Sequence, residues 1–243
     1  MKNLFTLTGF RRYFANTSWL IAEKIIRLAV GLFVGVWVAR FLGPEQFGTL
    51  SYAQAFVGLF GAFATLGMDG IVIKHLVKDD ENRDLLLGTA FILKLLGAMV
   101  AVFIISIVTV TTSNDNKEVI IITIIASALV FQSLNVIDFY FQSIVLSRYI
   151  VIVNLISQLV VSLIRIALIL AEAPLITFAY VILFDAVILA VGYIYVYKHK
   201  NLSFRQWNFN KQTASELLKY SWPLAISGIV ISIYMKIDQV MIK

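Results

Sequence analysis

Seven long apolar segments constrain the fold of this chain more than any other feature of its sequence. A helix needs about 20 apolar residues to cross the hydrocarbon core of a bilayer. Backbone polar groups in lipid must be hydrogen-bonded within their own segment, which a helix achieves. The sequence therefore predicts an all-α polytopic membrane protein. The predicted spans are residues 18–42, 47–73, 85–111, 118–141, 149–171, 175–197 and 221–243.

Composition supports this class and excludes several others. The chain is 60% hydrophobic and 14% charged, whereas a soluble domain carries about 25% charged residues. It has no Cys, which excludes disulfides and thiol chemistry. It also lacks the G-x-x-x-x-G-K-[ST] motif with which P-loop proteins bind ATP. We therefore predict no enzyme activity, cofactor or metal site. The net charge of +6 does not indicate nucleic-acid binding.

Basic residues are distributed unequally between the predicted loops. Cytoplasmic loops of membrane proteins are enriched in Lys and Arg, so the N-terminus is expected to be cytoplasmic. The alternate loops have only Arg40 and Lys117. The twelve basic residues on the expected cytoplasmic side are Lys2, Arg11, Arg12, Lys74, Lys78, Arg83, Arg148, Lys198, Lys200, Arg205, Lys211 and Lys219.

Two stretches of the chain resemble each other and suggest a duplicated architecture. Ser18-Trp19-Leu20-Ile21 opens the first span, and Ser221-Trp222-Pro223-Leu224 opens the seventh. Transporters built from repeated helical bundles show this kind of internal similarity. We predict a six-helix N-terminal lobe at residues 1–200, a cytoplasmic linker at residues 201–220, and the first helix of an incomplete second lobe at residues 221–243. The linker either lies as an amphipathic segment on anionic lipid or is a solvated connector.

Ionisable residues inside the predicted spans mark candidate functional sites, because they are costly to bury in a membrane. Glu23, Lys24 and Arg27 share one arc of the first helix. Glu23 and Arg27 are spaced i, i+4 and can pair directly, so a purely structural ion pair is an alternative. Lys94 lies deep in the third span, and Asp138 shares a face of the fourth with two amide side chains.

The fifth and seventh spans complete the set of polar faces. Asn154, Gln158 and Arg165 belong to a polar stripe on an otherwise apolar helix. This stripe lines a cavity or, alternatively, hydrogen-bonds neighbouring helices. In the seventh span Lys236 and Asp238 are two residues apart and point to nearly opposite sides, and we expect Asp238 to be the one that faces inward.

These polar faces predict a central hydrated cavity with more cations than anions, which suits an anionic cargo. The first, third and fifth helices would line it, with the seventh as a further candidate. The predicted substrate-binding residues are Lys24, Arg27, Lys94, Asn154, Gln158 and Arg165. The predicted ion-coupling residues are Glu23, Asp138 and Asp238.

Two motifs resemble those of polysaccharide-biosynthesis flippases, the Wzx-type O-antigen repeat-unit transporters of the multidrug/oligosaccharidyl-lipid/polysaccharide exporter superfamily. The first is Arg40-Phe41-Leu42-Gly43-Pro44-Glu45-Gln46-Phe47-Gly48, and it is close to the R-x-L-G-P-x-x-[FY]-G of that family. The second comprises Ser221-Trp222-Pro223-Leu224 and Lys236-Ile237-Asp238-Gln239-Val240-Met241, which resemble the start of the family's second lobe. The resemblance implies twelve or more helices in two lobes around a central cavity.

The resemblance also implies a function. It predicts a flippase of the bacterial cytoplasmic (inner) membrane that moves an undecaprenyl-diphosphate-linked oligosaccharide outward by alternating access, for O-antigen, lipopolysaccharide or other polysaccharide export. Its expected partners are the anionic lipid-linked oligosaccharide, membrane lipids, and polysaccharide polymerase and chain-length proteins. The alternatives are a multidrug or cation antiporter of the same superfamily, a membrane polymerase or glycosyltransferase, and a non-functional truncated fragment.

Overall fold

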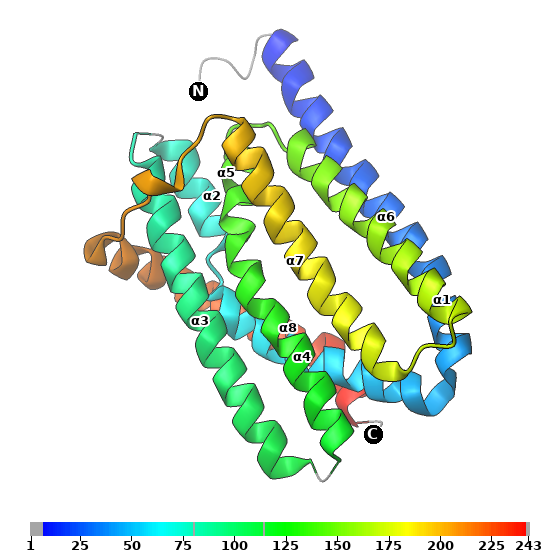
Figure 1. Cartoon of the computed structure of the whole chain (residues 1–243). Coiled ribbons are helices and arrows are strands. Elements are labelled where there is room, and N and C mark those ends of the chain that lie inside the picture. Colours follow the sequence, from blue (N-terminus) through cyan, green and yellow to red (C-terminus); the bar gives the residue numbers. More distant parts are fainter. Residues whose placement is uncertain (1–6, 80, 114, 242–243) are drawn as a thin grey trace.

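The protein is a bundle of long helices joined by short connectors (Figure 1). This computed structural model describes residues 7–79, 81–113 and 115–241, with side chains described for residues 14–61, 63–79, 81–113 and 115–236. No strand occurs in the described residues, which confirms the predicted all-α class. The helices are α1 (Leu7–Thr65), α2 (Asp69–Lys78), α3 (Arg83–Thr112), α4 (Asn116–Gln132), α5 (Val136–Ser143), α6 (Arg148–Leu170), α7 (Leu175–His199) and α8 (Lys211–Met241), with short 3-10 turns at Ser133–Asn135 and Phe204–Gln206.

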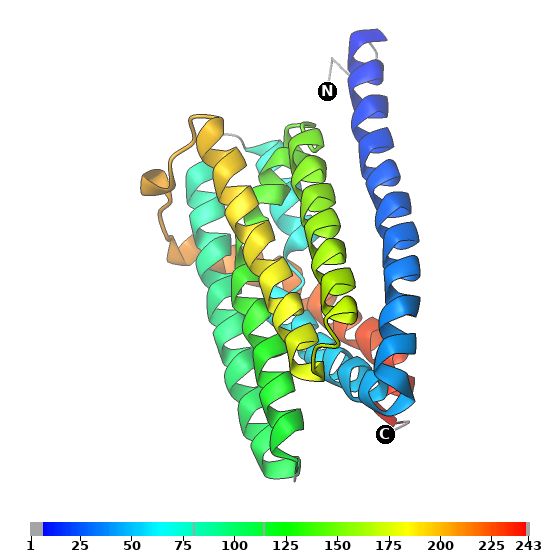
Figure 2. The same ribbon diagram turned by 45° about the vertical axis from the view of Figure 1, so that its right-hand side comes forward.

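Helix α1 contains the first predicted span and most of the second, separated by a sharp bend. Gly43 adopts φ 72° and ψ 174° inside the continuous helical run, a conformation that glycine adopts without steric cost. Pro44 follows, where its missing N–H is tolerated at the start of the second half. The N-terminal half stands along one side of the bundle, and the C-terminal half turns back beneath it (Figure 2).

Two predicted spans are broken in the structure. The span at 47–73 ends at Thr65, and a turn with positive φ at Leu66 and Gly67 leads into α2. The span at 118–141 is divided into α4, a 3-10 turn and α5. Hydropathy alone does not distinguish a broken apolar segment from a straight one, because it records side-chain polarity and not backbone direction.

Six helical stretches are long and apolar enough to cross a membrane, as judged by length and composition over the described residues. The first stretch runs from Phe14 to Lys78 and contains both predicted spans on either side of the Gly43 bend. The last stretch belongs to α8, which begins at Lys211. Residues 211–220 of the predicted linker are therefore helical, and Pro223 lies inside a helix instead of at its start.

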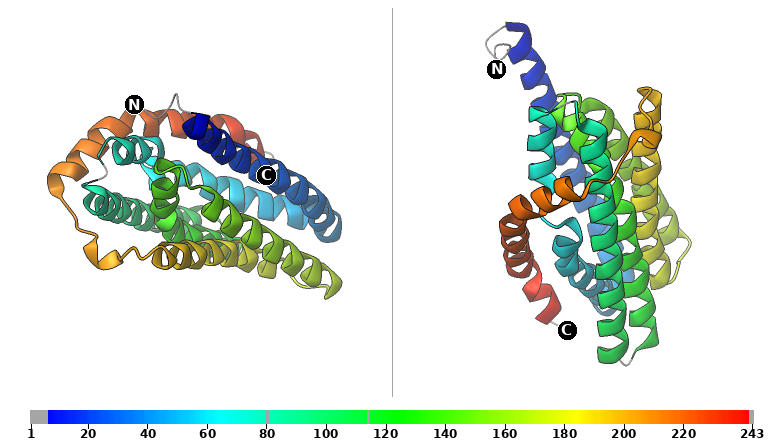
Figure 3. Two further views of the ribbon diagram at one scale, coloured as in Figure 1. Left: turned by 90° about the horizontal axis from the view of Figure 1, so that it is seen from above. Right: turned by 90° about the vertical axis from the view of Figure 1, so that its left-hand side faces the viewer.

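Helix packing follows the apolar and small residues. The N-terminal half of α1 lies along α6. Helix α8 crosses the side of the bundle that faces away from α7, steeply inclined to the other helices (Figure 3). Helix α4 packs against both α3 and α7. Ala53, Ala98 and Ala126 are almost fully buried in one of two core clusters, since small side chains allow helix backbones to approach closely.

The connector between α7 and α8 packs on the protein through Trp207. The Trp207 indole N–H donates to the Tyr197 hydroxyl at 2.9 Å. The Trp207 ring also contacts those of Phe91 and Phe204, with ring centroids 5.5 and 4.9 Å away. Asn210 then accepts hydrogen bonds from two backbone N–H groups in the first turn of α8. This end of α8 is thus fixed against α3 and α7.

Candidate functional site

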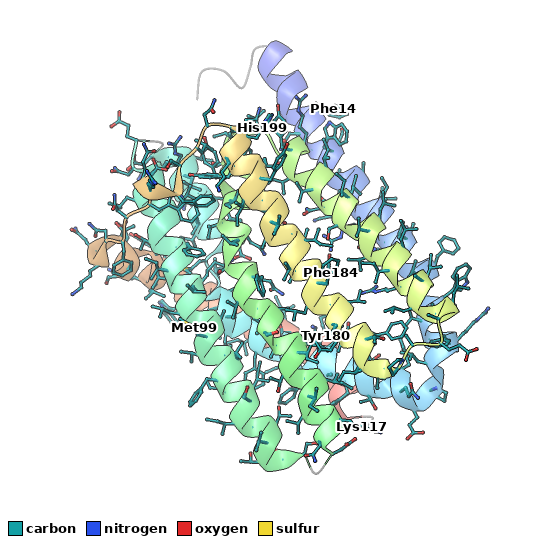
Figure 4. The ribbon with its side chains drawn as sticks, viewed as in Figure 1. Phe14, Met99, Lys117, Tyr180, Phe184 and His199 are labelled. Carbon is teal, nitrogen blue, oxygen red and sulfur yellow. The ribbon has the colours of Figure 1, made fainter. Side chains whose placement is uncertain are left out.

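A polar cavity of about 460 Å³ lies between α1, α4, α5, α6 and α7. On α7, Tyr180 and Phe184 project outward (Figure 4), while Asp185 lines the cavity. The cavity thus places charged side chains inside a bundle whose outer surface is apolar. Its lining residues are Leu20, Glu23, Lys24, Arg27, Ala128, Phe131, Gln132, Asn135, Asp138, Gln142, Ile150, Asn154, Ile182, Asp185, Ala186, Leu189 and Tyr193.

A chain of hydrogen bonds crosses one wall of this cavity and joins three helices. The Tyr193 hydroxyl donates to the Asn154 side-chain oxygen at 2.9 Å. The Asn154 amide nitrogen donates to Glu23 Oε1, also at 2.9 Å, and Arg27 pairs with the same carboxylate at 3.5 Å. Glu23, Asn154 and Tyr193 are all buried. Both ends of the Asn154 amide are therefore occupied by protein partners, which indicates a positioning role for this residue.

The other carboxylates of the cavity are also hydrogen-bonded. Asp138 accepts a hydrogen bond from Gln142 at 2.9 Å, one helical turn away on α5. Asp185 on α7 accepts one from the Ser157 hydroxyl on α6 at 2.6 Å. These bonds hold each carboxylate in a defined orientation. The hydrogen bond between Ser157 and Asp185 joins α6 to α7. A polar residue of α6 thus bonds to a neighbouring helix, which is the second interpretation given above for the polar stripe.

The charge of this cavity differs from the cationic surface predicted from the sequence. Lys24 and Arg27 line it together with Glu23, Asp138 and Asp185, which is one more carboxylate than cation. The physical reason is that the other predicted cations lie elsewhere, whereas all three carboxylates turn inward. A simple excess of positive charge in this cavity cannot serve as the basis for anion binding.

Lys94 lies outside this cavity, in an ion pair that is buried on the lysine side only. Its ammonium donates to Asp69 Oδ1 at 2.9 Å and lies 4.5 Å from the centroid of the Phe139 ring. The Lys94 side chain is 3% exposed and that of Asp69 is 53% exposed. Asp69, the first residue of α2, is placed there by the break after α1, which the sequence analysis did not predict.

The remaining predicted site residues do not line this cavity. Gln158 and Arg165 are half-buried on α6 but are not among its lining residues. The Asp238 side chain lies outside the described residues. The structure thus brings together Lys24, Arg27, Asn154, Glu23 and Asp138 and separates them from Lys94, Gln158 and Arg165.

Tyr193 and Lys236 are examples of cavity residues that were not predicted as site residues from the sequence. Tyr193 lies in a continuous apolar run, where no local signal distinguishes it from an ordinary core aromatic. Lys236 was recognised as an ionisable residue within a span, but Asp238 was preferred to it. In the structure Lys236 lines a second cavity of about 580 Å³ between α1, α4, α7 and α8.

The fold and the cavity define a multi-pass membrane protein with a charged, polar chamber enclosed by its helices. Comparison with known families places it further: residues 13–243 match the sequence profile of the family described as "Polysaccharide biosynthesis protein". The match covers nearly the whole chain, and the protein therefore belongs to this family. This confirms the family resemblance of the two sequence motifs.

One solved structure shows the same fold. It is described as the inward-facing conformation of a multidrug resistance MATE family transporter of the MOP superfamily, with a TM-score of 0.59 and 15% sequence identity. The similarity covers 90% of this chain and 55% of that one, so the chain spans little more than half the length of the transporter that it resembles. A search of curated proteins gave no match.

Proposed function

We propose that this protein acts in a flippase that moves a lipid-linked oligosaccharide, carried on undecaprenyl diphosphate, across the membrane for polysaccharide export. The single observation that carries the proposal is the polar cavity within an apolar bundle in a chain of the polysaccharide biosynthesis family. A sugar headgroup needs a polar path through the bilayer, whereas its lipid tail can remain in hydrocarbon. The division into two lobes at residues 1–200 and 221–243 is part of the same proposal.

The chemistry of the cavity suits a sugar. Carboxylate and amide side chains from three helices and one 3-10 turn (Asp138, Asp185, Gln132 and Asn135) offer both acceptors and donors for hydroxyl groups. Phe131 and Tyr193 add aromatic surface. Oriented polar groups beside aromatic and aliphatic side chains are typical of sites that recognise small molecules.

We further propose a bacterial inner membrane location with the N-terminus in the cytoplasm. Phe14 on α1 and His199 on α7 lie at one end of the molecule, and Lys117 at the start of α4 lies at the other (Figure 4). By the sequence, most basic loop residues belong to the loops at the end marked by Phe14 and His199. Cytoplasmic loops of membrane proteins are enriched in Lys and Arg. In that orientation, outward movement of each negative charge is favoured by about 2.3 kcal/mol per 100 mV of membrane potential.

The test uses the gene in its own chromosomal context. Lys24→Gln and Arg27→Gln, alone and together, are expected to reduce the polymer at the cell surface and to accumulate its lipid-linked precursor in the inner leaflet. Arg40→Gln is the matched control, since Arg40 is an exposed cation of the same helix that does not line the cavity. Normal surface polymer in the double variant, with equal protein levels, would contradict the proposal.

A second candidate function is favoured by the carboxylates. Three of them (Glu23, Asp138 and Asp185) line the cavity beside two aromatic rings, which is a pattern suited to a cationic drug or a coupling cation. A multidrug or cation antiporter would export cationic dyes, and its dye efflux would be lost in Asp138→Asn. Dye sensitivity of the deletion strain with unchanged surface polymer would favour this candidate over the flippase.

A further inference from the structure

A second cavity adjoins the first and differs from it in chemistry. It lies between the C-terminal half of α1, α4, α7 and α8 and has a volume of about 580 Å³. Ala128, Gln132 and Ile182 line both cavities, so the two chambers share one wall. Gln132, the polar member of this wall, is the last residue of α4 before the 3-10 turn.

Lys236 is the one charged side chain among the described residues that line this second cavity. The other polar members are neutral: Gln54, Thr65, Gln132 and Ser232. Lys236 forms no hydrogen bond or ion pair with any residue whose side chain is described. Its surroundings therefore supply polar contacts but no negative charge.

Space for the Lys236 ammonium is provided by a glycine on the facing helix. A Cβ atom built on Gly58 of α1 would overlap the Lys236 Nζ atom and approach its Cε to 2.9 Å. Every other residue type would therefore displace the end of the lysine side chain. The close approach directs the ammonium into the cavity between α1 and α8.

Two of the other deep cations are neutralised by protein carboxylates, whereas Lys24 and Arg165 form no ion pair with the described residues. Arg27 pairs with Glu23, and Lys94 pairs with Asp69. An ammonium at membrane depth without such a partner is unfavourable, and an anionic ligand would offset that cost. Lysine is a compact point charge that binds phosphate groups.

We infer that Lys236 binds the phosphate of a lipid-linked anionic cargo in the second cavity, while the sugar occupies the first. This inference rests on the proposed flippase function and makes it more specific. The sequence alone instead predicts Lys24, Arg27, Lys94 and Arg165 as the cationic substrate-binding residues. Because the two cavities share Gln132, one cargo molecule could span both.

Charge exchange at Lys236 tests the inference in cells that carry the variant at the native locus. Lys236→Gln is expected to lower surface polymer by about tenfold or more, because charge-assisted hydrogen bonds to phosphate are roughly twice as strong as neutral ones. Lys236→Arg should retain most of the export. Lys219→Gln, which removes an exposed cation from the same helix, is the control and should behave as the wild type.

Chemical rescue separates the charge from the structure of the side chain. The chain has no cysteine, so Lys236→Cys introduces a single thiol. A methanethiosulfonate reagent that carries an ethylammonium group restores a positive charge and should restore export. The ethylsulfonate reagent should not. Equal export after both reagents, or full export by Lys236→Gln, would overturn the inference.

Ligand binding by the purified protein distinguishes a failure of the inference about Lys236 from a failure of the proposed flippase function. Farnesyl diphosphate serves as a probe, with farnesol as the uncharged comparison and phosphatidylglycerol as an ordinary phospholipid. Wild-type protein should bind farnesyl diphosphate better than both, and Gly58→Leu should weaken that preference as Lys236→Gln does. Equal binding of phosphatidylglycerol would contradict the cargo subsite. If the gene deletion left surface polymer unchanged, the flippase function itself would fail.

Discussion

Replacing Tyr193 by phenylalanine should weaken the hydrogen-bond chain that orients Glu23 and Arg27, without leaving a void. The substitution removes the hydroxyl that donates to Asn154 at 2.9 Å and keeps the aromatic ring. Tyr193 and Asn154 are 5% and 8% exposed, but both line the polar cavity, so replacement of the lost donor by a cavity water sets the lower bound of the effect. The Asn154 oxygen is then left without this partner, while its amide group still donates to Glu23.

The magnitude follows from two bounds. Hydrogen bonds between membrane helices contribute about 0.6 kcal/mol on average and about 1.7 kcal/mol at most. Leaving a buried acceptor unsatisfied costs about 1–3 kcal/mol. We therefore expect Tyr193→Phe to reduce the free energy of unfolding by about 0.5–2 kcal/mol. For a chain of this size, 1 kcal/mol corresponds to a shift of about 2–4 °C in Tm.

Thermal unfolding in detergent, combined with a double-mutant cycle, measures this contribution. In an Asn154→Ala background the acceptor is already absent, so Tyr193→Phe should then have almost no further effect. Tyr195→Phe is the control, because Tyr195 lies on the same helix, is 69% exposed, and makes no hydrogen bond through its hydroxyl with the described residues. An equal loss of stability in both backgrounds would refute the reasoning.

The remaining predictions concern stability and use the same unfolding assay. Asp69→Ala should cost about 1–3 kcal/mol because it leaves the buried Lys94 ammonium without its carboxylate, and the cost stays below that of a fully buried pair because Asp69 is half-exposed; Lys94→Met should cost less, and the reverse order would refute this. Trp207→Ala should cost about 2–4 kcal/mol and speed tryptic cleavage at exposed Arg205, whereas unchanged cleavage would show that the connector is not fixed. Gly43→Ala should cost about 1–3 kcal/mol, because φ 72° with ψ 174° is a backbone conformation that essentially only glycine adopts; an unchanged Tm would refute this.

Local features of the sequence determined the class of the fold and part of the candidate site. The hydrophobicity of each residue is a local property that the sequence shows directly. The structure confirms long apolar helices at the predicted segments. The first predicted span ends at residue 42, next to the bend that the structure shows at Gly43. Glu23 and Arg27 pair as their i, i+4 spacing predicts, because both residues belong to one rigid helix.

Contacts between helices were decided only by the tertiary structure. Glu23 meets Asn154 across 131 positions of the chain, and Lys94 meets Asp69 because α1 breaks before α2. Helical periodicity shows which residues share a face, but the rotation and tilt of each helix decide what that face contacts. Those angles depend on how all the helices pack together. This packing places Lys236 in the lining of one cavity and leaves Lys94 outside the other.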